Sequence, residues 1–125
     1  MIDHIDHFVL TVKSLETTLS FYERVLGFTR DIQPNRPASL KFGSQKINVH
    51  EVGHTFEPKA AHPTPGAADF CLITKTPIDE VIAHLTSQNV PIEIGPVPRN
   101  GAQGSMTSIY FRDPDSNLVE VSKYD

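Results

Sequence analysis

The sequence predicts an α+β fold built from two copies of a βαβββ module, and two observations carry this prediction. The first is an internal repeat, because residues 5–28 and 67–90 each contain an apolar run, a short polar hinge and an amphipathic segment. The second is a set of short strand patterns after each amphipathic segment. We therefore expect one domain spanning residues 1–125, with module one at about 3–53 and module two at about 67–124.

Each module is expected to open with a strand followed by a helix. The strands are the apolar runs Phe8-Val9-Leu10 and Phe70-Cys71-Leu72-Ile73. In the first helix, apolar residues recur at spacings of three and four between residues 15 and 26. Ser14 is the expected N-cap of this helix, and Gly27 is expected to end it in a left-handed conformation.

The second helix has its own boundary signals. Thr76 is the expected N-cap, and Pro77 suits the first helical position because its missing N–H has no helical acceptor. Asn89 is expected to end the helix in a left-handed conformation. The strands expected after the two helices are 39–42 and 46–52 in module one, and 91–94, 108–112 and 118–123 in module two. Residues 113–117 form a turn, and 53–66 and 95–105 are expected to be loops.

The composition excludes two classes of partner. The chain has 125 residues, a formal net charge of −4 and no cluster of Lys and Arg, so no nucleic-acid partner is expected. No stretch has the roughly eighteen consecutive apolar residues that a membrane span needs, so no membrane partner is expected. The single cysteine, Cys71, cannot form an internal disulfide, and its place in an apolar run predicts a buried, inert thiol. A cytoplasmic location fits this cysteine usage.

Polar side chains occupy related places in the two repeats. His7 precedes the first apolar run, and Asp69 has the matching place in the second. Glu120 lies between two valines of the final strand, where alternation turns its side chain to the opposite face. Asn48 and His50 share one face of the corresponding strand in module one. This mixture of imidazole and carboxylate groups suits a first-row divalent metal, and each residue taken alone also has a purely structural explanation.

Two further residues are candidates for substrate contact. Arg99 lies in the expected loop 95–105 and could meet an anionic substrate, or it could be ordinary exposed surface. Tyr110 shares a strand face with Ser108 and could line a cleft or pack in the core.

Three segments resemble the vicinal oxygen chelate superfamily, which includes glyoxalase I, extradiol dioxygenases and bleomycin-resistance proteins. They are the opening Ile5-Asp6-His7-Phe8-Val9-Leu10-Thr11-Val12, the helical Phe21-Tyr22-Glu23-Arg24-Val25-Leu26-Gly27-Phe28, and the closing Tyr110-Phe111-Arg112-Asp113-Pro114-Asp115-Ser116-Asn117-Leu118-Val119-Glu120. The resemblance covers nearly the whole chain and is strongest to short single-domain, glyoxalase-like members.

The resemblance implies that the two modules form an incomplete, U-shaped barrel around a metal site, commonly within a homodimer. It implies one divalent ion (Fe, Ni, Zn, Mn or Co) held from the first and last strands of the modules. His7 and Glu120 match these places directly. Asn48 or His50 could supply the third ligand, and we favour His50 because imidazole binds such metals better than an amide oxygen. Asp69, where many relatives have His, is a fourth ligand or a base beside the metal.

The function expected from this resemblance is that of a metal-dependent lyase or isomerase acting on a small oxygen-bearing molecule. The metal would stabilise an enolate or oxyanion, and Glu120 or Asp69 would carry the proton. One alternative is an extradiol-type ring-cleaving dioxygenase, which Asp69 disfavours because that activity needs a particular His-His-Glu set. Another is a metal-free protein that sequesters a small molecule, as in drug resistance.

Overall fold

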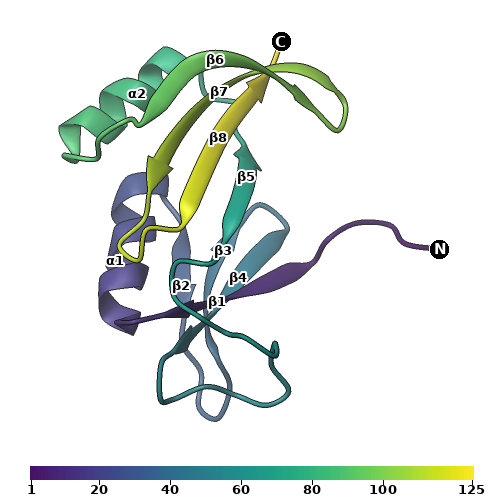
Figure 1. Cartoon of the computed structure of the whole chain (residues 1–125), viewed down its shortest axis with the longest axis vertical. Coiled ribbons are helices and arrows are strands. Elements are labelled where there is room, and N and C mark those ends of the chain that lie inside the picture. Colours follow the sequence, from purple (N-terminus) through teal and green to yellow (C-terminus); the bar gives the residue numbers. More distant parts are fainter. The chain divides into compact units, whose positions relative to one another are not determined.

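The computed structural model of the protein describes all 125 residues and confirms two βαβββ modules. The chain forms two compact units, Met1–Ala67 and Ala68–Asp125, each of which contains one module. The elements in chain order are β1 (His7–Val12), α1 (Leu15–Leu26), β2 (Thr29–Asp31), β3 (Ala38–Phe42), β4 (Gln45–Glu51), β5 (Asp69–Ile73), α2 (Ile78–Ser87), β6 (Ile94–Gly101), β7 (Gly104–Arg112) and β8 (Leu118–Tyr124) (Figure 1).

The two sheets have the same topology. The first has the strand order β1-β4-β3-β2 and the second β5-β8-β7-β6, so each strand of module one has a counterpart in module two. In both, the first and last strands of the module pair in parallel, and the remaining pairs are antiparallel. Parallel pairing needs a long crossover, and here the helix and the two middle strands provide it. The predicted duplication is therefore present in the strand pairing.

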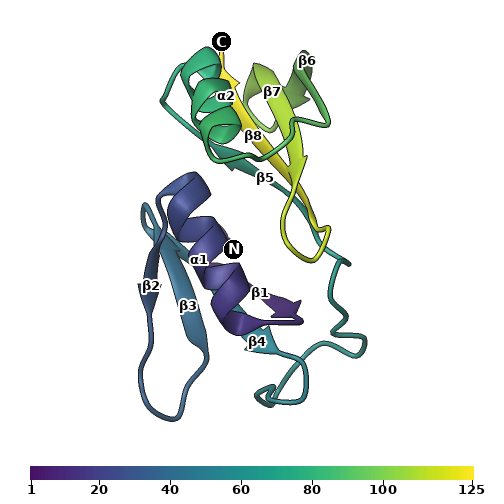
Figure 2. The same cartoon turned by 90° about the vertical axis from the view of Figure 1, so that its left-hand side faces the viewer.

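In the first unit, α1 lies along one face of its sheet (Figure 2). Alternate residues of β1, β3 and β4 are buried on this side together with one face of the helix, as period-two and period-3.6 patterns require. The core of this unit contains Leu10, Val12, Leu19, Tyr22, Val25, Leu40, Ile47 and Val49, none more than 2% exposed. The other face of the sheet carries His7, Asn48 and His50.

The boundaries predicted for the first helix are confirmed. The Ser14 hydroxyl accepts a hydrogen bond from the N–H of Thr17, at 3.3 Å, and this satisfies one of the unpaired donors at the helix start. Gly27 ends the helix with φ of 73°, a conformation that glycine adopts without steric cost. Arg30 of β2 then pairs with Glu16 and Glu23 of the helix, which ties the next strand to it.

The start of the second helix differs from the prediction. Helix α2 begins at Ile78, and its N-cap residue is Pro77, which has an extended ψ of 138°. The side chain of Pro77 makes no capping hydrogen bond. Thr76 is thus one residue too early to cap the helix. The predicted end is confirmed, because Asn89 adopts φ of 59° after the last turn.

The segment 95–105 is a second correction, since it is not a loop. Strand β6 runs from Ile94 to Gly101 and pairs with β7, which already begins at Gly104, whereas the predicted strand 91–94 is absent. Pro96 and Pro98 are tolerated because β6 is an edge strand, where an N–H facing outward is not needed. The pairing register with β7 shifts between Ile94 and Val97. Such a shift interrupts the alternation of apolar and polar residues by which a strand is predicted from sequence. Strand β2 was also not predicted.

Two connecting segments behave as predicted. Residues 53–66 contain neither helix nor strand, apart from an isolated bridge between Glu51 and His54. Residues 113–117 form the turn between β7 and β8, and its polar groups are paired with one another. Asp113 Oδ1 accepts from the N–H groups of Asp115 and Asn117, at 2.9 and 3.0 Å. No helix is long and apolar enough to cross a membrane.

Candidate functional site

The strand registers show which candidate residues are equivalent in the two modules. In module one, Val9 of β1 pairs with Asn48 of β4, and in module two, Cys71 of β5 pairs with Glu120 of β8. Val9 and Cys71 are themselves equivalent, because Phe8-Val9-Leu10 matches Phe70-Cys71-Leu72. Asn48 is therefore the counterpart of Glu120. His7 and Asp69 remain counterparts at the starts of β1 and β5.

His50 has a different counterpart. It pairs with Thr11, four residues along β1 from His7, and its place in module two is taken by Ser122. Four residues of strand separate His7 from His50 by about 14 Å between Cα atoms, whereas His7 and Asn48 are about 8 Å apart. Two ligands of one ion have donor atoms within roughly 4 Å of each other, so the shorter separation suits a shared ion better. Of the two residues left open by the sequence, the register favours Asn48.

His7 is oriented by its neighbour in the sequence. Its Nδ1 lies 2.8 Å from Oδ2 of Asp6, and this hydrogen bond is the main reason why the pKa of Asp6 is lowered. A carboxylate bound to one ring nitrogen keeps the proton there and leaves the lone pair of Nε2 free. Metal-binding histidines are commonly held in this way. Sequence reasoning missed Asp6, although an acid directly before the histidine was visible.

Two polar atoms on the same face of the first sheet are buried without a partner. They are Oδ1 of Asn48 and Nδ1 of His50. His50 is only 4% exposed, and its ring lies beside Phe56, with 5.6 Å between ring centroids. Burial, and then the charge of Lys59, lower the pKa of His50, so this imidazole is neutral near pH 7. Buried polar atoms without partners are uncommon, and an unfilled oxygen acceptor is what a cation requires.

Glu120 is held by a short chain of hydroxyl groups on the second sheet. The Ser122 hydroxyl donates to Oε2 of Glu120 at 3.1 Å and lies 2.6 Å from the hydroxyl of Ser108. Both serines are fully buried. No hydrogen bond reaches Oε1 of Glu120, so one carboxylate oxygen is available to a ligand. Alternation places Ser122 on the face of Glu120, and this spacing could have identified it from the sequence.

Cys71 is exposed, which corrects the predicted buried thiol. It lies on an edge strand whose alternate residues Asp69, Cys71 and Ile73 are all exposed, so only one face of this apolar run packs into the core. Its Sγ is 3.3 Å from the Ser122 hydroxyl. Partial burial of the sulfur raises the pKa of the thiol, and the charge of Glu120 raises it further. The thiol is therefore protonated at neutral pH.

Asp69 lies in the field of a cation. It shares a row of the sheet with Leu118 and Arg112, on the face of Glu120. Arg112 pairs with Glu93 at 3.0 Å, and this contact is the main reason why the pKa of its guanidinium is raised, with a smaller contribution from Asp69. Asp69 itself is exposed and makes no hydrogen bond through its side chain, so its carboxylate is open to a ligand or a proton.

Within neither unit do three or more His, Cys, Asp or Glu side chains gather into a group that could hold a metal ion. His7, Asn48 and His50 belong to the first unit, and Asp69 and Glu120 belong to the second. The available donors nevertheless fit a divalent ion chemically. They are an imidazole nitrogen of His7 that Asp6 does not occupy, a buried amide oxygen without a partner, and a carboxylate with one free oxygen.

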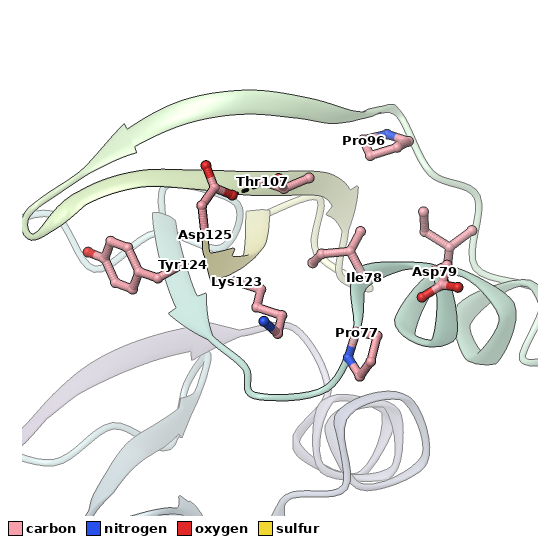
Figure 3. A pocket seen from close by; sticks show the side chains of 9 residues that line it. Pro77, Ile78, Asp79, Pro96, Thr107, Lys123, Tyr124 and Asp125 are labelled. Carbon is pink, nitrogen blue, oxygen red and sulfur yellow. Dashed lines mark hydrogen bonds between the residues drawn. The ribbon is translucent and has the colours of Figure 1, made fainter.

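The second unit also has a hollow outside this set of donors. Its volume is about 470 Å³, and it lies between the start of α2 and strands β6–β8 (Figure 3). Pro77, Ile78 and Ile82 line it from the helix side, and Thr107 and Lys123 from the sheet. By alternation, Thr107 and Lys123 are on the sheet face opposite to Glu120. None of the predicted site residues lines this hollow.

Paired βαβββ modules with metal-type donors at equivalent strand positions define a glyoxalase-type protein of the vicinal oxygen chelate class. The chain matches the Glyoxalase/Bleomycin resistance protein/Dioxygenase superfamily over residues 4–121, and it belongs to this superfamily.

Three comparisons give the sequence identity and the structural similarity of this chain to known proteins. The chain is 52% identical over 124 residues to virulence protein STM3117 of Salmonella typhimurium, covering 99% of this chain and 86% of that protein. The crystal structure of STM3117 superposes with a TM-score of 0.97 at 51% identity, covering 100% of this chain and 99% of that one. Glyoxalase domain-containing protein RDO1 of Mycosarcoma maydis is 43% identical over 120 residues, covering 96% of this chain and 68% of that protein.

Proposed function

We propose that this protein is a metal-dependent lyase or isomerase of glyoxalase type that acts on a small oxygen-bearing molecule. The observation that carries the proposal is the equivalence of donors between modules, with His7 matching Asp69 and Asn48 matching Glu120. His7 and Glu120 are the proposed ligands. Asn48 is the proposed third ligand because the strand register places it nearer to His7 than His50, which donor chemistry had favoured. Asp69 is the proposed fourth ligand or the base.

The bound ion would supply a Lewis acid that offsets negative charge developing on substrate oxygens. The protein's own groups prepare the donors. Asp6 holds Nδ1 of His7 and so leaves Nε2 as the ring nitrogen that faces a ligand. Ser122 occupies one oxygen of Glu120 and leaves Oε1 free. The carboxylate of Asp69 has no hydrogen-bonded partner, so it is available to accept a proton at Oδ1 or Oδ2.

A metal-binding comparison of variants tests this proposal. The wild-type protein, reconstituted in turn with Fe, Ni, Zn, Mn and Co, should retain about one ion per chain. His7→Ala and Glu120→Gln should each weaken binding by at least about tenfold, and His62→Ala, which changes an exposed loop histidine, should not. Asn48→Ala and His50→Ala then separate the two candidates for the third ligand, and the former should have the larger effect.

The ion that binds decides the activity to assay. Iron would direct the search to ring-cleaving oxygenation of catechol-like compounds, whereas nickel or zinc would direct it to isomerisation. A wild-type protein that binds none of the five ions would contradict the proposal and leave a sequestering protein as the explanation. We further propose a homodimer, which light scattering of the purified protein tests by mass against the 13.9 kDa chain.

A further inference from the structure

We infer that Arg99, held over the ring of Tyr110, binds a carboxylate of the substrate, so that the protein acts on a small carboxylic acid. This inference rests on the proposed function, because it concerns the same sheet face as Glu120. Tyr110 is the direct cross-strand partner of Glu120. Directly paired residues have Cα atoms about 5 Å apart, so the two side chains leave the same sheet face from adjacent positions.

Arg99 reaches this ring from the edge strand β6. It pairs with Met106, which shares a sheet face with Ser108 and Tyr110, and so its side chain is on the face of Glu120. The guanidinium carbon lies 5.4 Å from the centre of the Tyr110 ring, and Nε donates to the Tyr110 hydroxyl at 2.9 Å. Nη1 donates to the carbonyl oxygen of Pro98 at 3.0 Å. The side chain is therefore folded back along the strand although the residue is exposed.

These contacts orient Arg99 without neutralising it. Arg30, Arg36 and Arg112 each have a carboxylate within 4.0 Å, whereas no carboxylate lies that close to Arg99. Two of its five N–H groups are used, so three are left for a ligand. Ordering the side chain in advance removes part of the entropy cost of binding. A planar guanidinium with two free donors matches a carboxylate in a bidentate manner.

Charge favours a carboxylate over a phosphate. The chain carries a net charge of −4, and Glu120 and Asp69 share this sheet face with Arg99. Arg112, the other guanidinium on this face, is already paired with Glu93. Arg99 alone compensates a single negative charge, and a doubly charged phosphate would need a second unpaired cation. The ligand that fits is a small acid, with its carboxylate at Arg99 and its remaining oxygen atoms toward Glu120.

Paired ligands that differ only in this group test the inference on the metal-free protein. The probes are 3,4-dihydroxybenzoate against catechol, and pyruvate against methyl pyruvate, followed through the arginine Nε–H resonances by NMR. At least one acid should bind roughly tenfold tighter than its neutral partner, since charge-assisted hydrogen bonds are lost with the carboxylate. The Nε–H resonance that is absent in Arg99→Gln should be the one that shifts.

The variants decide whether Arg99 is responsible. Arg99→Gln should abolish the preference for the acid, Arg99→Lys should retain part of it, and Arg36→Gln, a matched change in the first unit, should retain all of it. Equal binding of acid and neutral partner, binding of neither acid, or an unchanged preference in Arg99→Gln would overturn the inference. Metal content is measured separately. A preference without metal binding would refute only the enzyme proposal, and metal binding without a preference would refute only the role of Arg99.

Discussion

Asn117 holds three parts of the second module together, and its removal gives a stability change that can be estimated. Its Nδ2 donates to Oδ2 of Asp113 at 2.9 Å, and its Oδ1 accepts from the N–H of Ala68 at 2.9 Å. The side chain, 1% exposed, thus connects the β7–β8 turn to the residue that precedes β5. Asn117→Ala removes both bonds and leaves the Ala68 N–H and one carboxylate oxygen of Asp113 without these partners.

The expected cost is about 3 kcal/mol of unfolding free energy. A hydrogen bond to a charged group contributes roughly 1.5–3 kcal/mol, and an unpaired N–H costs about 1–3 kcal/mol when buried, with the lower end suiting the half-buried Ala68. These two contributions overlap in part, because the turn can rearrange so that the freed polar groups bind water. A domain of this size is stable by only about 5–15 kcal/mol, so the loss is large. It should lower Tm by roughly 10 °C.

Urea unfolding followed by circular dichroism measures this loss. Asn100→Ala is the matched control, because Asn100 is exposed on β6 and makes no side-chain hydrogen bond, and it should stay within about 0.5 kcal/mol of wild type. If Asn117→Ala also stayed within that range, the hydrogen bonds of Asn117 to Ala68 and Asp113 would not be a significant source of stability for the second module. The "DPDSN" motif would then need another explanation.

Two further predictions concern a glycine and a salt bridge. Gly95→Ala should cost about 3 kcal/mol, because at φ of 114° its Cβ would lie 2.6 Å from the Ser108 carbonyl oxygen. Gly53→Ala, at φ of 83° but with no atom within 4 Å, should cost only about 1 kcal/mol in the same urea titration, and equal losses would refute the steric argument. Hydrogen bonds from Arg30 and then Ser20 lower the pKa of Glu16 from 4.5, so its stabilising contribution is complete above that value and is lost as pH falls through the folded-state pKa. The urea midpoint of Glu16→Gln should therefore vary less than that of wild type between about pH 5 and pH 3, and parallel curves would contradict this linkage.

Local features of the sequence were sufficient for much of the fold. The repeat predicted both modules, and Ser14 and Gly27 predicted the limits of α1, because capping depends on residues a few positions apart. The loop 53–66 and the turn 113–117 followed from turn chemistry in the same way. The positions of His7, Asp69 and Glu120 on strands were also readable from alternation. Apart from the repeat, all of these signals act between residues that are close in the chain.

Only the tertiary structure decided which distant residues meet. Strand pairing is non-local, so no pattern in the sequence shows that Val9 pairs with Asn48 while Cys71 pairs with Glu120. This register distinguishes Asn48 from His50, which share one strand face and look equivalent in the sequence. The prolines of β6 are compatible with a strand only at a sheet edge. Cys71 is exposed on β5, the other edge strand, whereas Ser122 of the neighbouring strand is buried on the same face. Edge position and register belong to the assembled sheet, and neither is encoded in any single segment.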